Sequence, residues 1–302
     1  MPEYPDVILY LERLEAKVGG QVLEAVRLGN PFVLRTVDPP LSALHGLTVQ
    51  GFRRMGKRIV FAFPDELFLV IHLMIAGRLR WKKKGASHRG RDVLAVLDFA
   101  DGSLVFTEAS KKKRAKMHVV RGEAALDPFD RGGLEVLDAT EAEFAERIRS
   151  RRHTLKRAMT DPRLFSGIGN AYSDEILWHA KLSPVKLTTS LTDEEVHTLY
   201  TSIRAELVRW ADLLRAEVGE GFPDKVTAFR PEMAVHGKYR EPCPRCGDPI
   251  QRIVHAENES NYCVTCQTGG RLLADRALSR LLKSDWPRTL EELDERLGRD
   301  DA

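Results

Sequence analysis

Four cysteines constrain the fold of this chain more tightly than any other feature of its sequence. They form two C-x-x-C pairs, Cys243 with Cys246 and Cys263 with Cys266, and the chain has no other cysteine. One such pair would suit a redox site, but two pairs at this spacing bring four thiolates into a tetrahedron around zinc. Because a four-cysteine shell has no open position, we expect one structural Zn²⁺ on which a small finger depends for folding. Its hairpin strands are expected at residues 247–251 and 261–263.

Upstream of the finger, the hydrophobic pattern changes from strand-like to helical. Helical spacing predicts a leading helix over residues 6–18, which Gly19-Gly20 ends. Strand-like runs follow at residues 22–27, 47–54, 58–63, 67–73, 93–99 and 103–107, with Asp101-Gly102 as a hairpin turn. Helical patterns then cover residues 141–150, 155–160, 171–179 and 194–217. The sequence therefore predicts a sheet-rich domain (1–122), a linker near 132–137, a helical domain (133–232), the finger (236–285) and an acidic tail (286–302).

Composition and charge narrow the class of protein. No apolar run approaches the roughly 18 residues of a membrane span, and the N-terminus lacks a basic stretch followed by an apolar one. We therefore expect a cytoplasmic protein with no membrane partner. The net charge is only +3, yet basic residues gather in three clusters, over residues 78–91, 111–116 and 147–157. Any one cluster is compatible with a solvated face, but three together favour a polyanionic partner.

Two further stretches suggest chemistry. In the helical domain, Gly167-Ile168-Gly169-Asn170 separates two helices, and such a turn leaves backbone N–H groups free for a phosphate. An ordinary helical hairpin with glycine caps fits the same residues. At the N-terminus, removal of Met1 would leave Pro2 as a secondary amine with a pKa of about 7.7–8, able to form an iminium beside the Glu3 carboxylate. The simpler interpretation is that Pro2 only permits removal of Met1.

Five motifs in a fixed order resolve these alternatives. They are Met1-Pro2-Glu3-Tyr4-Pro5-Asp6-Val7, Arg54-Met55-Gly56-Lys57-Arg58, His72-Leu73-Met74-Ile75-Ala76-Gly77, the Gly167–Asn170 turn with Asp174-Glu175, and the four-cysteine finger. With these motifs the chain resembles the formamidopyrimidine-DNA glycosylase and endonuclease VIII family of base-excision repair enzymes. The resemblance implies an α+β multidomain fold. Its parts would be an N-terminal β-sandwich with a leading helix, a helix–two-turns–helix domain and a C-terminal zinc-ribbon finger, with damaged DNA bound between them.

The resemblance also implies roles for individual residues. Pro2 would attack C1′ of a damaged nucleotide and Glu3 would protonate the opening sugar, while Lys57 would lie near the phosphate or the departing proton. Lys156 and Asn170 would hold backbone phosphates. The implied function is that of a bifunctional DNA glycosylase and abasic-site lyase, acting by β or β,δ elimination. This chemistry requires that the damaged base be flipped out of the duplex before C1′ can be reached. It also requires basic groups that hold the kinked backbone and an apolar side chain that fills the gap left in the base stack.

The chain departs from the family pattern where lesions are recognised. Met74 and Ile75 stand where the family often has Gly and Met at the wedge. Residues 108–114, including Lys111, replace a loop that carries an aromatic filler and the Arg that reads the opposite cytosine. Asn258 takes the place of a phosphate-binding Arg, and Asp6 that of a frequent Glu. We therefore expect a monomeric enzyme that is poor on 8-oxoguanine and acts on oxidised pyrimidines, abasic sites, or single-stranded or bubble DNA.

Two other functions fit parts of the pattern. A DNA-binding module of the same architecture would need no catalysis, and a zinc-ribbon RNA-binding protein also uses helical phosphate clamps. The joint presence of Pro2, Glu3 and Lys57 favours the enzyme, because binding alone requires none of the three.

Overall fold

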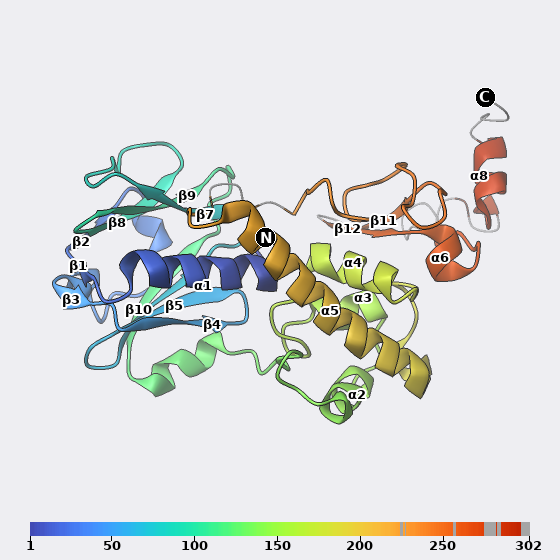
Figure 1. The fold of residues 1–302 in the computed structure, drawn as a ribbon, viewed down its shortest axis with the longest axis horizontal. Helices are drawn as coiled ribbons and strands as arrows, with labels where there is room; N and C mark the ends of the chain where they lie inside the picture. The colour runs from blue at the N-terminus through green and yellow to red at the C-terminus, as the bar shows by residue number, and fades with distance from the viewer. Residues whose placement is uncertain (224–225, 227, 256–257, 275–281, 283–284, 297–302) are drawn as a thin grey trace. The chain divides into compact units, whose positions relative to one another are not determined.

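The computed structural model describes residues 1–223, 226, 228–255, 258–274, 282 and 285–296. Its contacts form two compact units. The first comprises Met1–Gly133 with Val208–Thr227, and the second comprises Leu134–Leu207 with Ala228–Ala302. Helix α5 (Asp193–Val218) contributes its first part to the second unit and its last part to the first (Figure 1). The predicted boundaries of the sheet-rich domain, the helical domain and the finger stay a prediction, and residues 297–302 of the predicted tail lie outside the described residues.

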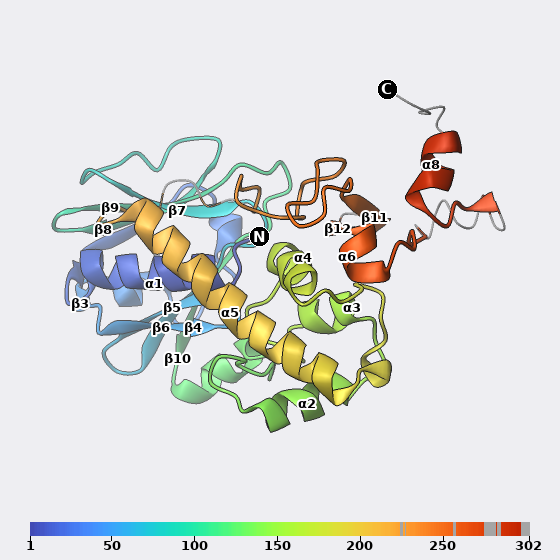
Figure 2. The same ribbon diagram turned by 45° about the vertical axis from the view of Figure 1, so that its right-hand side comes forward.

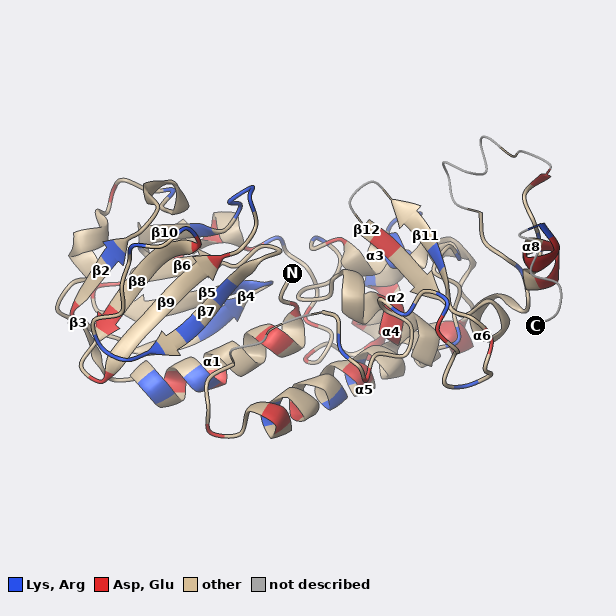
Figure 3. Ribbon diagram, turned by 90° about the horizontal axis from the view of Figure 1, so that it is seen from above, with Lys and Arg blue, Asp and Glu red and all other residues tan. Residues whose placement is uncertain are grey.

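Two four-stranded antiparallel sheets build the first unit. One has the order β10-β6-β5-β4 and the other β2-β8-β9-β7, and a short ribbon pairs β1 with β3. The two sheets appear as two layers in Figures 1 and 2, and Figure 3 shows α1 running along one side of them. The strands are β1 (Val22–Leu23), β2 (Ala25–Leu28), β3 (Leu47–Thr48), β4 (Gly51–Met55), β5 (Arg58–Phe63), β6 (Leu67–His72), β7 (Gly77–Lys82), β8 (Val93–Phe99), β9 (Gly102–Glu108) and β10 (Lys116–Arg121).

Helix α1 (Tyr4–Val18) joins the two sheets into one core. Its residues Val7, Tyr10, Leu14 and Val18 recur every three or four positions and are fully buried in a cluster that both sheets share. The helix begins two residues before the predicted start because Asp6 Oδ2 accepts a hydrogen bond from the Glu3 backbone N–H at 2.9 Å, in a capping arrangement. This cap fixes the backbone of Glu3 directly beside the N-terminus.

Strands β7 and β10 are absent from the sequence-based prediction. In β7 the outward positions carry Arg78, Arg80 and Lys82, which conceal the alternation with buried Leu79. The turn between β8 and β9 was predicted one residue too late. Phe99 pairs with Gly102, so Ala100 and Asp101 form the turn. Gly102 is needed for packing instead, because a Cβ at that position would lie 2.4 Å from the Trp81 ring.

The second unit combines helices with a hairpin. Its helices are α2 (Glu141–Arg149), α3 (Leu155–Thr160), α4 (Asn170–His179), the first part of α5, α6 (Val264–Thr268) and α8 (Leu290–Arg296). A 3-10 turn lies at Thr188–Ser190 in this unit, and others lie at Pro31–Val33, Leu41–Leu44 and Glu123–Phe129 in the first unit. Phe144 on α2 packs its ring against Phe165 and Tyr200, at centroid distances of 5.2 and 5.6 Å. None of the helices in the described part of the chain has both the length and the apolar character of a membrane span.

The hairpin of the finger lies between the cysteine pairs, at β11 (Gln251–His255) and β12 (Asn258–Tyr262). The prediction of strands at residues 247–251 and 261–263 was therefore wrong. The residues directly after Cys246 form a tight turn instead of a strand, and in this turn the Gly247 N–H donates to the Cys243 carbonyl at 2.9 Å. Trp286, Leu290 and Leu293 from the C-terminal segment then pack against Ile253 and Tyr262, so that acidic α8 (Figure 3) adds apolar cover to the hairpin.

Candidate active site and nucleic-acid interface

In the first unit, several charged groups converge on the N-terminus. Pro2 and Glu3 are buried, and Glu3 is only 3% exposed. The terminal amine, carried here by Met1, has a pKa below its ordinary value. Burial is the main cause, the positive charges of Arg78 and Lys57 act in the same direction, and the carboxylates of Glu3 and Asp6 oppose it. An amine in these surroundings is neutral over more of the physiological pH range than a solvated one.

The β4–β5 hairpin brings Lys57 to this place. Met55 pairs with Arg58, which leaves Gly56 and Lys57 as the two turn residues, and Gly56 has the positive φ of 61° that such a turn requires. Arg54 holds the turn by donating from Nη1 to the Gly56 carbonyl at 2.7 Å. Its guanidinium also lies 4.7 Å from the ring centre of Tyr4. Arg54 therefore links the Lys57 turn to the residue that follows Glu3.

A short loop between β6 and β7 presents Ile75. The Gly77 N–H donates to the Leu73 carbonyl at 2.9 Å, and a Cβ at Gly77 would lie 2.1 Å from that oxygen, so only glycine fits. Met74 has a φ of 53°, in the left-handed region that is unfavourable for a residue with a side chain. Ile75 is 52% exposed, an unusual state for a large aliphatic side chain.

Basic residues line one end of the β10-β6-β5-β4 sheet. Lys116, His72 and Arg58 occupy directly opposite positions on three neighbouring strands. The pKa of His72 is lowered to about 3, mainly by burial and also by the positive charges of Arg58, Lys57, Lys116 and His118. Lys116 and Arg58 thus lie on either side of a neutral His72, and their positive charges make this end of the sheet suited to an anion. Figure 3 shows basic segments on β5 and also along β7 of the other sheet.

The loop after β9 is compact and basic. The buried Glu108 carboxylate accepts hydrogen bonds from the backbone N–H groups of Arg114, at 2.9 Å, and Ala115, at 3.0 Å. The Lys113 ammonium donates to the Glu108 carbonyl and to Asp92, the latter at 3.1 Å. Lys111 is exposed. Glu108 thus closes the loop on itself, and residues 109–115 include no aromatic side chain.

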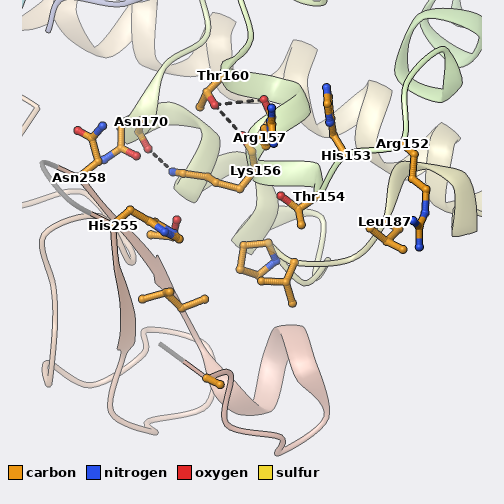
Figure 4. Close-up of a pocket in the computed structure, with 15 residues that line it drawn as sticks. Arg152, His153, Thr154, Lys156, Arg157, Thr160, Asn170, Leu187, His255 and Asn258 are labelled. Carbon is orange, nitrogen blue, oxygen red and sulfur yellow. Dashed lines mark hydrogen bonds between the residues drawn. The ribbon is translucent and has the colours of Figure 1, made fainter. Parts of the chain in front are cut away.

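In the second unit, a pocket of about 690 Å³ brings Lys156, Asn170 and Asn258 together (Figure 4). The Asn170 side-chain amide donates to the Glu259 carbonyl at 3.0 Å, which joins the start of α4 to β12. None of the described residues that line the pocket is acidic, whereas five are basic or histidine: Arg152, His153, Lys156, Arg157 and His255. The pocket therefore suits an anion such as a phosphate.

Lys156 is more constrained than the sequence suggests. It is only 9% exposed, and its ammonium donates to the Asn170 carbonyl and to Asp174 Oδ1, both at 2.5 Å. Asp174 Oδ2 also lies 2.8 Å from His236 Nδ1. The more exposed cations of the pocket are Arg152 and Arg157. Sequence analysis identified Asp174 within a motif but gave it no role, and no local pattern marks His236, which lies 62 residues away.

The neighbouring Glu175 anchors the approach to the finger. Its carboxylate accepts hydrogen bonds from the backbone N–H groups of Ala234, Val235 and His236, at 2.7 to 2.9 Å. Burial raises the pKa of Glu175, whereas the three N–H donors lower it and do not outweigh burial. The Asp174-Glu175 pair therefore connects the floor of the pocket to the chain just before the first cysteine pair.

The four cysteines form one cluster, with their sulfur atoms within 4.8 Å of one another. Cys246 Sγ and Cys263 Sγ are 3.4 Å apart, too far for a disulfide, and all four cysteines are free thiols. Burial raises the pKa of the Cys243 thiol, but N–H donors that include the Trp178 indole outweigh it and bring the pKa to about 7. Four clustered sulfur ligands, one of them readily ionised, fit a tetrahedral zinc ion.

Comparisons with known proteins agree over the length of both units. Residues 1–115 match the model of the formamidopyrimidine-DNA glycosylase N-terminal domain, residues 133–211 that of the H2TH domain of the same enzymes, and residues 240–269 that of a zinc finger found in FPG and IleRS. The chain is 31% identical over 277 residues to a formamidopyrimidine-DNA glycosylase of Lactococcus lactis subsp. cremoris, which covers 88% of this chain and 99% of that protein.

Solved structures of the Lactococcus lactis enzyme are similar to this one. Its complex with DNA that contains an abasic site has a TM-score of 0.77 at 29% identity, with 88% of this chain and 99% of that chain covered. Its complex with DNA that contains an oxidised pyrimidine has a TM-score of 0.77 at 29% identity, with 88% and 100% covered.

Proposed function

This chain belongs to the formamidopyrimidine-DNA glycosylase family and is a DNA glycosylase of base-excision repair, and we propose that it acts through an iminium at Pro2 and then cleaves the strand. The observation that carries the proposal is the burial of Pro2 and Glu3 together at the N-terminus, where the charges of Lys57 and Arg78 also act. A nucleophilic amine needs such surroundings at neutral pH.

The chemistry begins once Met1 is removed and Pro2 carries the free amine. Its nitrogen attacks C1′ of the damaged nucleotide, the glycosidic bond breaks, and the departing base takes a proton from water. The Glu3 carboxylate accepts the proton that the amine gives up and passes it to the ring oxygen of the sugar, which opens to leave an iminium between Pro2 and C1′. Loss of a C2′ proton then expels the 3′ phosphate, and water releases the amine. Lys57, held at its hairpin turn, lies against the phosphate or accepts the departing proton.

The anion pocket of the second unit is proposed to bind the DNA backbone. Lys156 and Asn170 would donate to phosphate oxygens, and Asn258 would add an uncharged amide donor from β12. Arg152 and Arg157 supply exposed charge at the same pocket. Because Asp174 and His236 fix Lys156, we expect Lys156 to define where a phosphate sits and the exposed arginines to provide most of the long-range attraction.

Substrate choice follows from the wedge and from the loop after β9. Exposed Ile75 is suited to enter the base stack, and Met74 precedes it in the loop. Lys111 and its neighbours supply charge but no stacking face for an orphaned base. We therefore propose that the enzyme prefers lesions that are easily flipped, including oxidised pyrimidines, abasic sites and lesions in single-stranded or bubble DNA. It would work as a monomer.

Cys243, Cys246, Cys263 and Cys266 would hold one zinc ion. The ion would stabilise the fold of the finger and take no part in the reaction, because four thiolates complete its coordination. In this way the metal would fix β11 and β12, which carry His255 and Asn258 to the pocket.

Borohydride trapping on abasic DNA tests the proposal. The processed protein should become covalently linked to the DNA. A protein whose N-terminus is blocked by an uncleaved extension should not be trapped, although it should still bind. Full trapping of the blocked protein would exclude Pro2 as the nucleophile, and failure of both proteins to be trapped would favour a non-catalytic binding protein.

A further inference from the structure

Arg78 lies at the junction between the Ile75 loop and the rest of the first unit. It is the second residue of β7, and its guanidinium donates to three backbone carbonyls. Nε donates to Val226 at 2.5 Å, and Nη1 donates to Gly77 at 2.6 Å and to Ile75 at 3.1 Å. Val226 follows α5 and is buried in the main core of the unit. Arg78 therefore ties the loop that presents Ile75 to a segment 148 residues away.

The loop that Arg78 holds has a strained backbone. Met74 has a φ of 53°, in the left-handed region that is sterically unfavourable for an L-residue with a side chain. Such conformations persist only where the surrounding contacts determine them. The hydrogen bond between Gly77 and Leu73 closes the loop internally. The hydrogen bonds from Arg78 attach the Ile75 carbonyl of the loop to the buried Val226 segment.

The described contacts of Arg78 are all with the backbone. Its three acceptors are neutral carbonyls, and no ion pair joins Arg78 to a carboxylate within the described residues. Its interactions here are therefore directional hydrogen bonds to the loop and to the Val226 segment.

We propose that Arg78 is a positioning residue whose hydrogen bonds hold the Ile75 loop in the conformation that enters the base stack. The inference rests on the proposed function, in which Ile75 is the wedge. Arginine suits this role because its planar fork reaches several acceptors at once. Lysine would keep the charge but lose the fork, and glutamine would keep one donor but lose the reach to three acceptors.

Two variants test this role. With 2-aminopurine opposite the abasic site, Arg78→Lys and Arg78→Gln should both lose most of the fluorescence increase that accompanies wedge insertion, because neither side chain reaches the three acceptors. Single-turnover trapping on saturating abasic DNA should fall less than the fluorescence change, because an abasic site exposes C1′ without a base to be flipped.

Arg80→Gln is the matched control, because it removes the same charge from the next outward position of β7. It should leave the fluorescence change as in wild type. The proposal is overturned if both Arg78 variants keep the full fluorescence signal, or if Arg80→Gln loses it equally. Trapping of the N-terminally blocked protein would overturn the role of Pro2 instead, and circular dichroism of each variant identifies any that fails to fold.

Discussion

The amine site of the first unit and the anion pocket of the second differ in the elements and side chains that support them. The amine site sits at the start of α1 on a large apolar core, with Glu3 and Asp6 buried and Lys57 and Arg78 partly exposed. The anion pocket lies on small helices and a hairpin, over a buried network of Lys156, Asp174 and His236. Among the described residues, the finger packs on small apolar clusters, one of which includes cysteines.

This difference separates two requirements. Covalent chemistry needs a few groups whose protonation is controlled, so one change in the amine site should affect rate and leave binding intact. Binding of a polyanion needs several exposed cations on a stable frame, so one change in the pocket should affect affinity by a small amount unless the frame itself fails. Four predictions test this contrast.

The largest effect should come from the metal. Cys246→Ser removes one of four ligands, and structural zinc contributes on the order of 10 kcal/mol to the folding of such fingers. Elemental analysis should fall from about one zinc per chain, and DNA affinity should be lost while the first unit keeps its fold. Val254→Ala, at an exposed position of β11, serves as control. Normal DNA affinity in a metal-free protein would contradict the structural role of zinc.

Glu3→Gln should reduce base removal by roughly 10²–10⁴-fold, the usual value of a positioned acid. Cleavage of a preformed abasic site should be reduced less, because the glycosidic bond is already broken. DNA affinity should not change. Gel assays on a lesion and on abasic DNA, with exposed Glu15→Gln on α1 as control, measure the two steps. Equal retention of both activities would remove Glu3 from the mechanism.

Arg157→Gln in the pocket should weaken binding equally for all sequences and reduce the slope of log affinity against log salt by about 1. The trapping rate at saturating DNA should be unchanged. Arg163→Gln is the control, since Arg163 is paired with Asp161 at 2.8 Å and does not line the pocket. An unchanged salt slope in Arg157→Gln would show that the pocket does not bind phosphate.

The smallest effect concerns pH and the first unit alone. The pKa of His72 is lowered to about 3, so between about pH 6.5 and 3 the unfolded chain binds a proton that the folded one does not. Stability should therefore fall as the pH falls through this window. His72→Gln should reduce the loss of Tm between pH 7.5 and 5 by about 4–8 °C, the effect of about 2 kcal/mol in such a domain. An equal loss in both proteins would contradict a neutral, buried His72.

The sequence by itself determined the family, the fold class and the residues of the metal cluster, and comparisons and structure confirmed these. It also located elements whose signal is local. Strand β5 and helix α3 have the predicted bounds, because alternation and helical spacing are properties of consecutive residues. The roles of Pro2, Glu3, Lys57, Lys156, Asn170 and Asn258 stay predictions.

Only the tertiary structure decided how distant residues meet. The bond from Asn170 to Glu259 spans 89 residues and that from Arg78 to Val226 spans 148, and no periodicity connects such positions. Strand β7 was missed for the same reason, because its outward arginines are typical of a solvated loop in the sequence alone. Its identity as a strand follows from its pairing with β9 in the folded chain. The same limit applies to Lys156, which the sequence presents as one of several free cations. Its burial and its bond to Asp174 arise only when α3 packs against α4, because the energy that fixes a charged group depends on the neighbours that surround it in space.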